Sequence, residues 1–143
     1  MDLIGTIARP ALAWIFVQGG IDAVRAPEPR ARTAGPLLGK LRDAAPDGFK
    51  DRLPEDATIV RVNAGLQIAA GAALAIGILP RLSALALAGS LTPTTVGGHA
   101  FWRLDDPAKR GPQRIQFAKN VAIIGGLLLA ATRPRLARTV PGE

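Results

Sequence analysis

Two long uncharged runs lie almost back to back in the middle of this 143-residue sequence. The first extends from Val62 to Pro80 and the second from Leu82 to Gly98, so that Arg81 alone separates them. A helix needs roughly 17–25 apolar residues to cross the hydrocarbon core of a bilayer, which is about the length of each run. Because helices of soluble domains carry charge on their outer faces, the two runs predict a helical hairpin that spans a membrane.

Two further segments are weaker candidates for membrane spans. The segment at 3–25 is apolar except for a few positions such as Arg9 and Asp22, and the segment at 114–132 is uncharged after Lys119. A cleaved signal peptide is the alternative for the first segment, but its basic leader and small-residue cleavage site are not obvious here. We therefore predict four spans.

The sequence thus predicts an all-α protein with one domain, folded as an up-and-down four-helix transmembrane bundle. Alanine and glycine recur every fourth residue in the spans, which favours close helix packing in lipid. Hydroxyl side chains around Pro93 are expected to bond the carbonyls that a proline kink frees. Within the domain at 1–143, the expected spans are residues 3–25, 58–79, 82–102 and 114–132, with a basic tail at 133–143.

The connection at 26–57 contains five prolines, so we do not expect it to form one continuous helix. Between the prolines, Leu37, Leu38 and Leu41 recur at helical spacing, with charged residues on the other faces. This pattern predicts a short amphipathic helix that lies at the membrane interface between the first two spans. A solvated loop with a single helical turn is the alternative.

The polar residues of the spans gather at one end of the predicted bundle. In an up-and-down bundle, the ends of the first and third spans and the starts of the second and fourth lie on one side of the membrane. Polar residues three or four positions apart also share a helix face, and they should face the bundle interior because a polar group facing lipid is costly. The predicted ligand-binding residues are Gln18, Asp22, Asn63, Gln67, Thr95, His99, Gln116, Lys119 and Asn120.

Each of these residues also has an interpretation without a ligand. The amide side chains would serve as hydrogen-bonding contacts between helices. Asp22 and Lys119 would reach the interface by snorkelling, and His99 would lie at the interface beside Phe101 and Trp102. The concentration of all nine residues in one half of the bundle favours a binding site, and no catalytic residue is predicted among them.

Composition excludes several kinds of chemistry. The net charge of +7 fits anionic lipid headgroups better than nucleic acid, because the basic residues flank the spans and form no stripe with aromatic residues. With no cysteine and one histidine, the chain cannot provide a thiol relay, CxxCH haem attachment or an intrachain bis-His haem. Asp22 and His99 are a weak basis for a metal site, so none is predicted. A redox role would need a bound organic cofactor, such as a quinone, or a partner subunit.

Three stretches carry a family resemblance: ARPALAWIFVQGGIDAVR, VRVNAGLQIAAGAALAIGILPRLSALALAGSLTPTTVGGHAFW and QRIQFAKN. Together they resemble the DoxX family of small four-helix bacterial membrane proteins, particularly its actinobacterial members, up to about Arg133. Members are named by likeness to a subunit of a membrane thiosulfate:quinone or terminal quinol oxidoreductase. The resemblance implies a multi-pass protein of the bacterial plasma membrane that works in a membrane redox or oxidative-stress complex.

Three functions stay open on the sequence. The first is a DoxX-like membrane subunit whose polar pocket binds a quinone or another amphipathic molecule, with soluble redox proteins docking on the charged connections. The second is a scaffold without a ligand or an activity, and the third is a small transporter, which would need a polar path that Ile68 to Leu79 does not offer. The predicted partners are the lipid bilayer and soluble redox proteins, and homo-oligomers are left open. We do not expect a self-sufficient enzyme.

Overall fold

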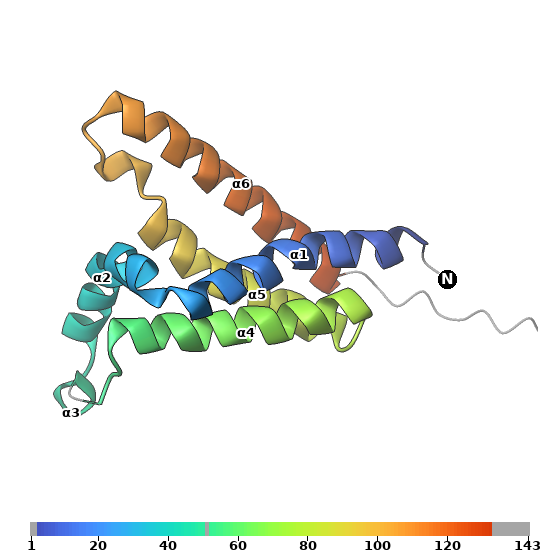
Figure 1. Ribbon diagram of the computed structural model, residues 1–143, viewed down its shortest axis with the longest axis horizontal. Coiled ribbons are helices and arrows are strands. Elements are labelled where there is room, and N and C mark those ends of the chain that lie inside the picture. The colour runs from blue at the N-terminus through green and yellow to red at the C-terminus, as the bar shows by residue number, and fades with distance from the viewer. Residues whose placement is uncertain (1–2, 51, 133–143) are drawn as a thin grey trace, which may run out of the picture.

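The computed structural model describes residues 3–50 and 52–132, so the predicted basic tail lies outside the described residues. Within those ranges the chain forms helices joined by short turns and contains no strand (Figure 1), which confirms the prediction of an all-α protein. The elements, in chain order, are α1 (Leu3–Arg25), α2 (Pro27–Ala44), α3 (Asp47–Lys50), α4 (Asp56–Ile76), α5 (Pro80–Gly98), the 3-10 helix η1 (Phe101–Arg103) and α6 (Pro107–Thr132).

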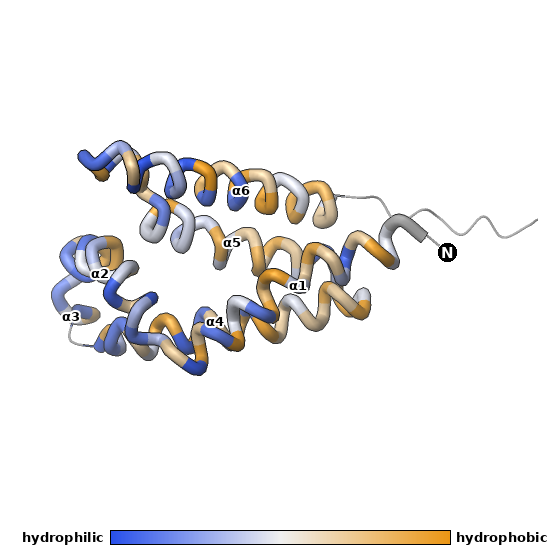
Figure 2. Tube along the Cα trace, turned by 45° about the horizontal axis from the view of Figure 1, so that its top comes forward, coloured by the Kyte–Doolittle hydropathy of each residue, from blue (hydrophilic) through white to orange (hydrophobic). Residues whose placement is uncertain are grey.

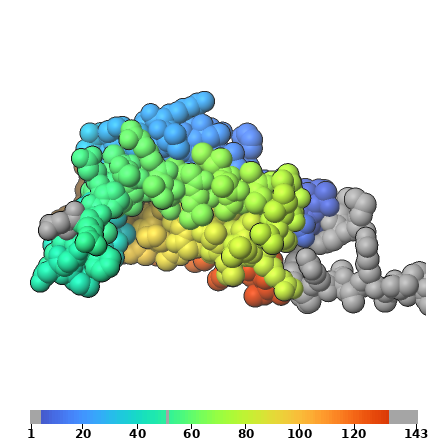
Figure 3. Space-filling model, turned by 90° about the horizontal axis from the view of Figure 1, so that it is seen from below, coloured from blue at the N-terminus to red at the C-terminus, as the bar shows by residue number. Residues whose placement is uncertain are grey.

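The four long helices run up and down the molecule. α1 packs along α4, α4 along α5, and α5 along α6, whereas α1 and α6 make little contact. The C-terminal ends of α1 and α5 and the N-terminal ends of α4 and α6 lie at the end that also holds α2 and α3 (Figure 1). Hydrophilic residues gather at this end (Figure 2), and α3 projects from it beside the start of α4 (Figure 3). We call it the polar end of the bundle.

A glycine sets the turn between α4 and α5. Gly77 has a φ of 78°, in the left-handed region that favours glycine. The amide of Ile78 donates to the carbonyl of Ala73 at 2.8 Å, and the amide of Gly77 donates to the carbonyl of Leu74 at 3.2 Å. These are the two hydrogen bonds of a Schellman cap. Pro80 then begins α5. Proline suits this position because the first N–H groups of a helix have no acceptor within the helix.

Small residues allow α1 and α4 to approach closely. A Cβ atom built on Gly20 would lie 2.7 Å from Cγ1 of Ile68 and 2.9 Å from the carbonyl oxygen of Ala64. A Cβ atom on Gly71 would lie 2.9 Å from Cγ2 of Val17. Such close approach supplies the van der Waals contact that holds helices together in lipid.

The buried core consists of Ala13, Phe16, Ala70, Leu74, Ala84, Leu87, Ala88, Leu91 and Leu127.

Large apolar side chains point outward from all four long helices. One from each is Trp14 at 68% exposed, Val62 at 68%, Leu82 at 62% and Leu129 at 70%. A soluble monomer rarely exposes apolar side chains so extensively, because water solvates them poorly. Lipid tails are as apolar as these side chains, so a bilayer accommodates the same surface.

Two of the described helices, α4 and α6, are long and apolar enough to cross a membrane. Only 22% and 6% of the residues in their most apolar windows are buried, so they do not resemble core helices of a soluble protein. α1 and α5 are not among the candidate spans, since Arg9, Gln18 and Asp22 lower the hydropathy of α1, and Arg81, two prolines and the hydroxyl residues lower that of α5. Two helices thus have the length and composition of a membrane span, and the four-span bundle stays a prediction.

The connection between α1 and α4 is more regular than the sequence predicts. α2 extends over 18 residues, so the alternative of a loop with one helical turn is wrong, and the helix is longer than expected. Pro36 lies inside α2, although proline removes a backbone hydrogen bond. Packing of α2 on α4 and α5 offsets that loss. α3 follows after Pro46 as a separate helix, so the connection is not one continuous helix, as predicted.

The connection between α5 and α6 also differs from its predicted bounds. α5 ends at Gly98 and not near 102, and α6 begins at Pro107 and not near 114. Between them, the rings of Phe101, Trp102 and Phe117 contact one another edge to face, with centroids 5.2–5.6 Å apart. This aromatic cluster holds η1 against α6. The chain therefore forms a short 3-10 helix where hydropathy alone suggests that the third span continues.

Candidate functional site

Two adjoining cavities lie at the polar end of the bundle. The smaller has a volume of about 240 Å³ and is lined from α1, α4, α5 and α6 and by Arg30 of α2. The larger has a volume of about 450 Å³ and is lined chiefly from α2, α4 and α5. Much of the wall of the larger cavity is apolar and includes Leu37, Leu38, Leu41, Ile59 and Val60.

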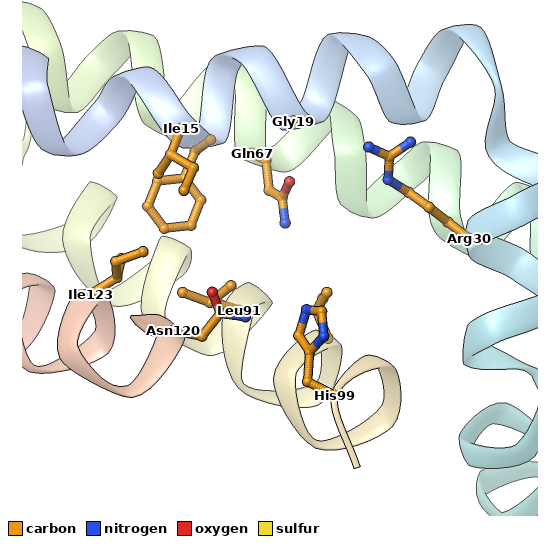
Figure 4. Close-up of a pocket in the computed structure, with 10 residues that line it drawn as sticks. Ile15, Gly19, Arg30, Gln67, Leu91, His99, Asn120 and Ile123 are labelled. Atoms are coloured by element: carbon orange, nitrogen blue, oxygen red, sulfur yellow. The ribbon is translucent and has the colours of Figure 1, made fainter. Parts of the chain in front are cut away.

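Four residues line both cavities, and we call them the polar junction: Arg30, Gln67, Thr94 and His99. They come from α2, from α4, from α5 and from the residue that caps the end of α5. Figure 4 shows that the side chains of Arg30, Gln67 and His99 point into one space. Segments far apart in the sequence therefore contribute polar groups to a single wall.

The polarity of the smaller cavity changes along the bundle axis (Figure 4). Arg30 lies toward α2, His99 follows, and Asn120 of α6 lies further along. Ile15 and Ile123 close the side away from Arg30. The cavity thus passes from a cationic side chain, through amide and imidazole groups, to hydrocarbon. This order matches the order of groups in an amphipathic molecule.

A chain of hydrogen bonds fixes part of this wall. Nε2 of Gln67 donates to Oγ of Ser90 at 2.9 Å, and Oγ of Ser90 donates to Oδ1 of Asn63 at 2.8 Å. Ser90 is only 5% exposed, so the chain joins α4 to α5 inside the bundle. Asn63 and Gln67 therefore serve as contacts between helices while they also line the larger cavity. The second N–H of Gln67 is left for another acceptor.

His99 is positioned by α6. Nδ1 of His99 lies 2.7 Å from Oε1 of Gln113. Because the amide oxygen can only accept, Nδ1 carries the hydrogen and Nε2 is the ring nitrogen left for the cavity. The aromatic cluster of η1 and α6 lies directly after this contact in the chain, so the end of α5 is held against α6 at two places.

Arg30 differs from Glu28 and Arg42, the two charged residues of α2 that form ion pairs. Glu28 lies 3.8 Å from Arg61, and Arg42 pairs with Asp56. Among the residues that the structure describes, none forms a hydrogen bond or an ion pair with Arg30. Its guanidinium group is exposed at the mouth of both cavities.

The nine predicted site residues divide into two groups. Four line the cavities: Asn63, Gln67, His99 and Asn120. The other five do not: Gln18, Asp22, Thr95, Gln116 and Lys119.

The second group lies elsewhere for identifiable reasons. Gln18 and Asp22 are exposed on α1, and Nζ of Lys119 donates to Oε1 of Gln116 at 3.1 Å on the outer face of α6. Thr95 is buried, and its hydroxyl donates to the carbonyl of Leu91 at 2.7 Å. Helical spacing and the cost of polar groups in lipid predicted that these residues face the bundle interior. For Gln18, Asp22, Gln116 and Lys119, which are exposed, that prediction is wrong. Their role in ligand binding stays a prediction.

Three residues of the site were not singled out from the sequence. Thr94 lies beside the predicted Thr95, and Ser90 is one of several hydroxyl residues in the otherwise apolar α5. Arg30 lies in the proline-rich connection, and no apolar residues at helical spacing around it indicate contact with the bundle. The one available clue was polarity in an otherwise apolar helix, which applies to Ser90 and not to Arg30.

The chemistry available at the polar junction is recognition by hydrogen bonds and charge. No group of three or more His, Asp or Glu side chains within the described residues could hold a metal ion. The junction offers a guanidinium, amide groups, a hydroxyl and an imidazole, next to hydrocarbon walls. Such a combination of apolar walls and a few polar groups is typical of a small-molecule site.

The fold and the cavities define a small helical membrane protein with a polar site at one end of its bundle. Residues 4–100 match the model of the DoxX family, so the chain belongs to the DoxX family. The match includes α1, α2, α4 and α5 and ends before α6. No curated protein and no solved structure matches the chain.

Proposed function

We propose that this DoxX-family protein binds the polar head of an amphipathic molecule, such as a quinone, at the polar junction. In this role it would be a subunit of a membrane-associated oxidoreductase or oxidative-stress complex, in the bacterial plasma membrane. The observation that carries the proposal is the pair of adjoining cavities that share four polar residues and have apolar walls. The larger, at about 450 Å³, falls within the ~300–1,000 Å³ that small-molecule sites occupy.

Hydrogen-bond donors suit the carbonyl groups of a quinone. Asn120 lines the smaller cavity, and its amide makes no hydrogen bond to any described residue. Gln67 has its second N–H to offer after the bond to Ser90. A quinone would accept from these donors and place its apolar tail against the hydrocarbon walls. The protein supplies binding and orientation, and the redox chemistry would belong to the quinone and to a partner.

Binding of a quinone can be measured with the full chain in lipid nanodiscs, with an isoprenyl benzoquinone as the probe. We expect saturable binding that Asn120→Leu weakens roughly tenfold, since a lost hydrogen bond costs about 1 kcal/mol or somewhat more. Gln116→Leu is the matched control, because Gln116 lies one turn earlier on α6 and is exposed. Absence of saturable binding, or equal losses in both variants, would favour the scaffold function instead.

The four-span topology has a separate test. The natural sequence has no cysteine, so single cysteines can be introduced without a reactive background. In inverted and right-side-out vesicles, cysteines at Arg81 and at Lys109 should react with a membrane-impermeant maleimide from opposite sides. Both residues are exposed, one at the α4–α5 turn and one at the start of α6. Labelling of both positions from one side would contradict the predicted topology.

A further inference from the structure

Arg30 is the one charged side chain that lines either cavity, among the residues that the structure describes. Burial of an apolar tail beside an uncompensated positive charge selects for a ligand whose head is negative, because an ionised head and a guanidinium form charge-assisted hydrogen bonds. Because Arg30 is exposed, water solvates its guanidinium in the empty site, and a neutral head would form weaker hydrogen bonds with it than an ionised head does. The cavities should therefore prefer a ligand with a negative head, whereas a quinone is uncharged.

We propose that the polar junction binds an amphiphile with an anionic head, a carboxylate or a phosphate, and that Arg30 is the residue that recognises it. This inference rests on the proposed function, since it uses the same site, and it specifies the charge of the ligand. The planar guanidinium presents several N–H donors in a fork that fits the paired oxygens of such a head. No residue of the sequence-predicted site provides a positive charge inside either cavity.

The acidic residues nearest in the chain do not neutralise Arg30. Glu28 is directed to Arg61 of α4, at 3.8 Å. Asp22 is exposed on α1 and lines neither cavity. Asp56 is held by Arg42 near the opposite end of α2. The arrangement thus keeps every nearby carboxylate away from the shared wall and leaves the guanidinium for a ligand.

Gln67 provides a second donor for the same head, through the N–H that does not bond Ser90. The hydroxyl of Thr94 donates to the carbonyl of Ser90 at 3.0 Å, so it offers the head no hydrogen. The tail has hydrocarbon on both sides of the junction, beneath α2 and toward Ile15 and Ile123. A cavity of about 450 Å³ suits one alkyl chain. We therefore infer a single-chain amphiphile.

The test compares three probes in nanodiscs of phosphatidylcholine, which has no net charge. The probes are a long-chain carboxylate, the alcohol of the same length, and inorganic phosphate, which has no tail. We expect the carboxylate to bind at least tenfold more tightly than the alcohol, and inorganic phosphate not to bind measurably. Arg30→Gln should remove this tenfold preference, whereas Arg32→Gln, which changes the net charge equally on the same helix, should leave it unchanged.

Several results would overturn the inference. Equal binding of the carboxylate and the alcohol would show that the site does not select charge, and quinone binding in the same nanodiscs would then leave the proposed function standing. Equal effects of Arg30→Gln and Arg32→Gln would assign the preference to general surface charge. By contrast, saturable competition by lysophosphatidylglycerol, which has one acyl chain, would support the inference and identify a membrane lipid as the source of the anionic head. If neither the carboxylate nor the quinone binds, both proposals fail together.

Discussion

His99 at the end of α5 and Gln113 of α6 meet with 2.7 Å between Nδ1 and Oε1, on the side of the bundle that holds both cavities. The contact orients the one imidazole of the chain and couples it to a helix that lies beyond the family match. α6 has little contact with α1, so α5 is its main support. The position of α6 and the orientation of His99 are therefore linked.

Replacement of Gln113 should weaken the contact between α5 and α6. Gln113→Ala removes the acceptor for Nδ1–H of His99, and a net hydrogen bond is worth about 1 kcal/mol, so we expect the free energy of unfolding to decrease by about that amount. Denaturant titration in detergent micelles measures it. Gln116→Ala, on the exposed face of the same helix, should have no effect. Equal stabilities of the Gln113→Ala variant and the natural protein would mean that His99 is held without its partner.

Loss of the Ser90 hydroxyl should destabilise the contact between α4 and α5. Ser90→Ala removes two hydrogen bonds to Asn63 and Gln67, and such bonds between membrane helices average ~0.6 kcal/mol with a maximum near ~1.7. We expect a decrease of about 1–2 kcal/mol in the free energy of unfolding, measured by denaturant titration in detergent micelles. Thr92→Val is the control, since that hydroxyl bonds only the carbonyl of Ala88 in its own helix. Equal stabilities of the two variants would show that the chain of hydrogen bonds adds nothing.

Even a methyl group at Gly20 should separate α1 from α4. In Gly20→Ala, the new Cβ would lie 2.7 Å from Ile68 Cγ1 and 2.9 Å from a backbone oxygen that cannot easily move. Overpacking of this kind costs about 1–3 kcal/mol. The control is Gly65→Ala, because no atom lies within 4 Å of its Cβ position and alanine favours helix by about 1 kcal/mol over glycine. The two substitutions should therefore shift the unfolding midpoint in opposite directions, and a shift in the same direction would contradict the close approach.

The pair Arg42 and Asp56 should hold α2 in place without adding much to global stability. Arg42 contacts the carboxylate of Asp56 and also donates to the carbonyl of Pro54 at 2.7 Å. Partly exposed ion pairs are worth at most about 1 kcal/mol, so Asp56→Asn should accelerate hydrogen exchange of α2 amides about fivefold and leave those of α4 beyond its first turn unchanged. High salt screens this ion pair, so it should also accelerate exchange of α2 amides in the natural protein, but by less than Asp56→Asn does. Lys50→Ala, which removes only a contact with Asp47 inside α3, should not alter exchange in α2.

Helix content was predictable because its signals are local. The two uncharged runs on either side of Arg81 predicted the central hairpin. Pro36 misled the prediction for α2, since the rule that proline ends a helix ignores packing against other elements. The start of α6 was missed for a similar reason, because a charged first segment of a helix looks like a loop when hydropathy alone is read.

The sequence by itself determined that the chain is helical and apolar and that its polar residues collect at one end, since periodicity and hydropathy depend only on neighbours in the chain. Only the tertiary structure decided which polar groups share a cavity. It placed Asn120 inside and Gln116 outside on one helix, and it brought Arg30 from the connection to the shared wall. The physical reason is that the face a helix buries depends on the side chains of the other helices against which it packs.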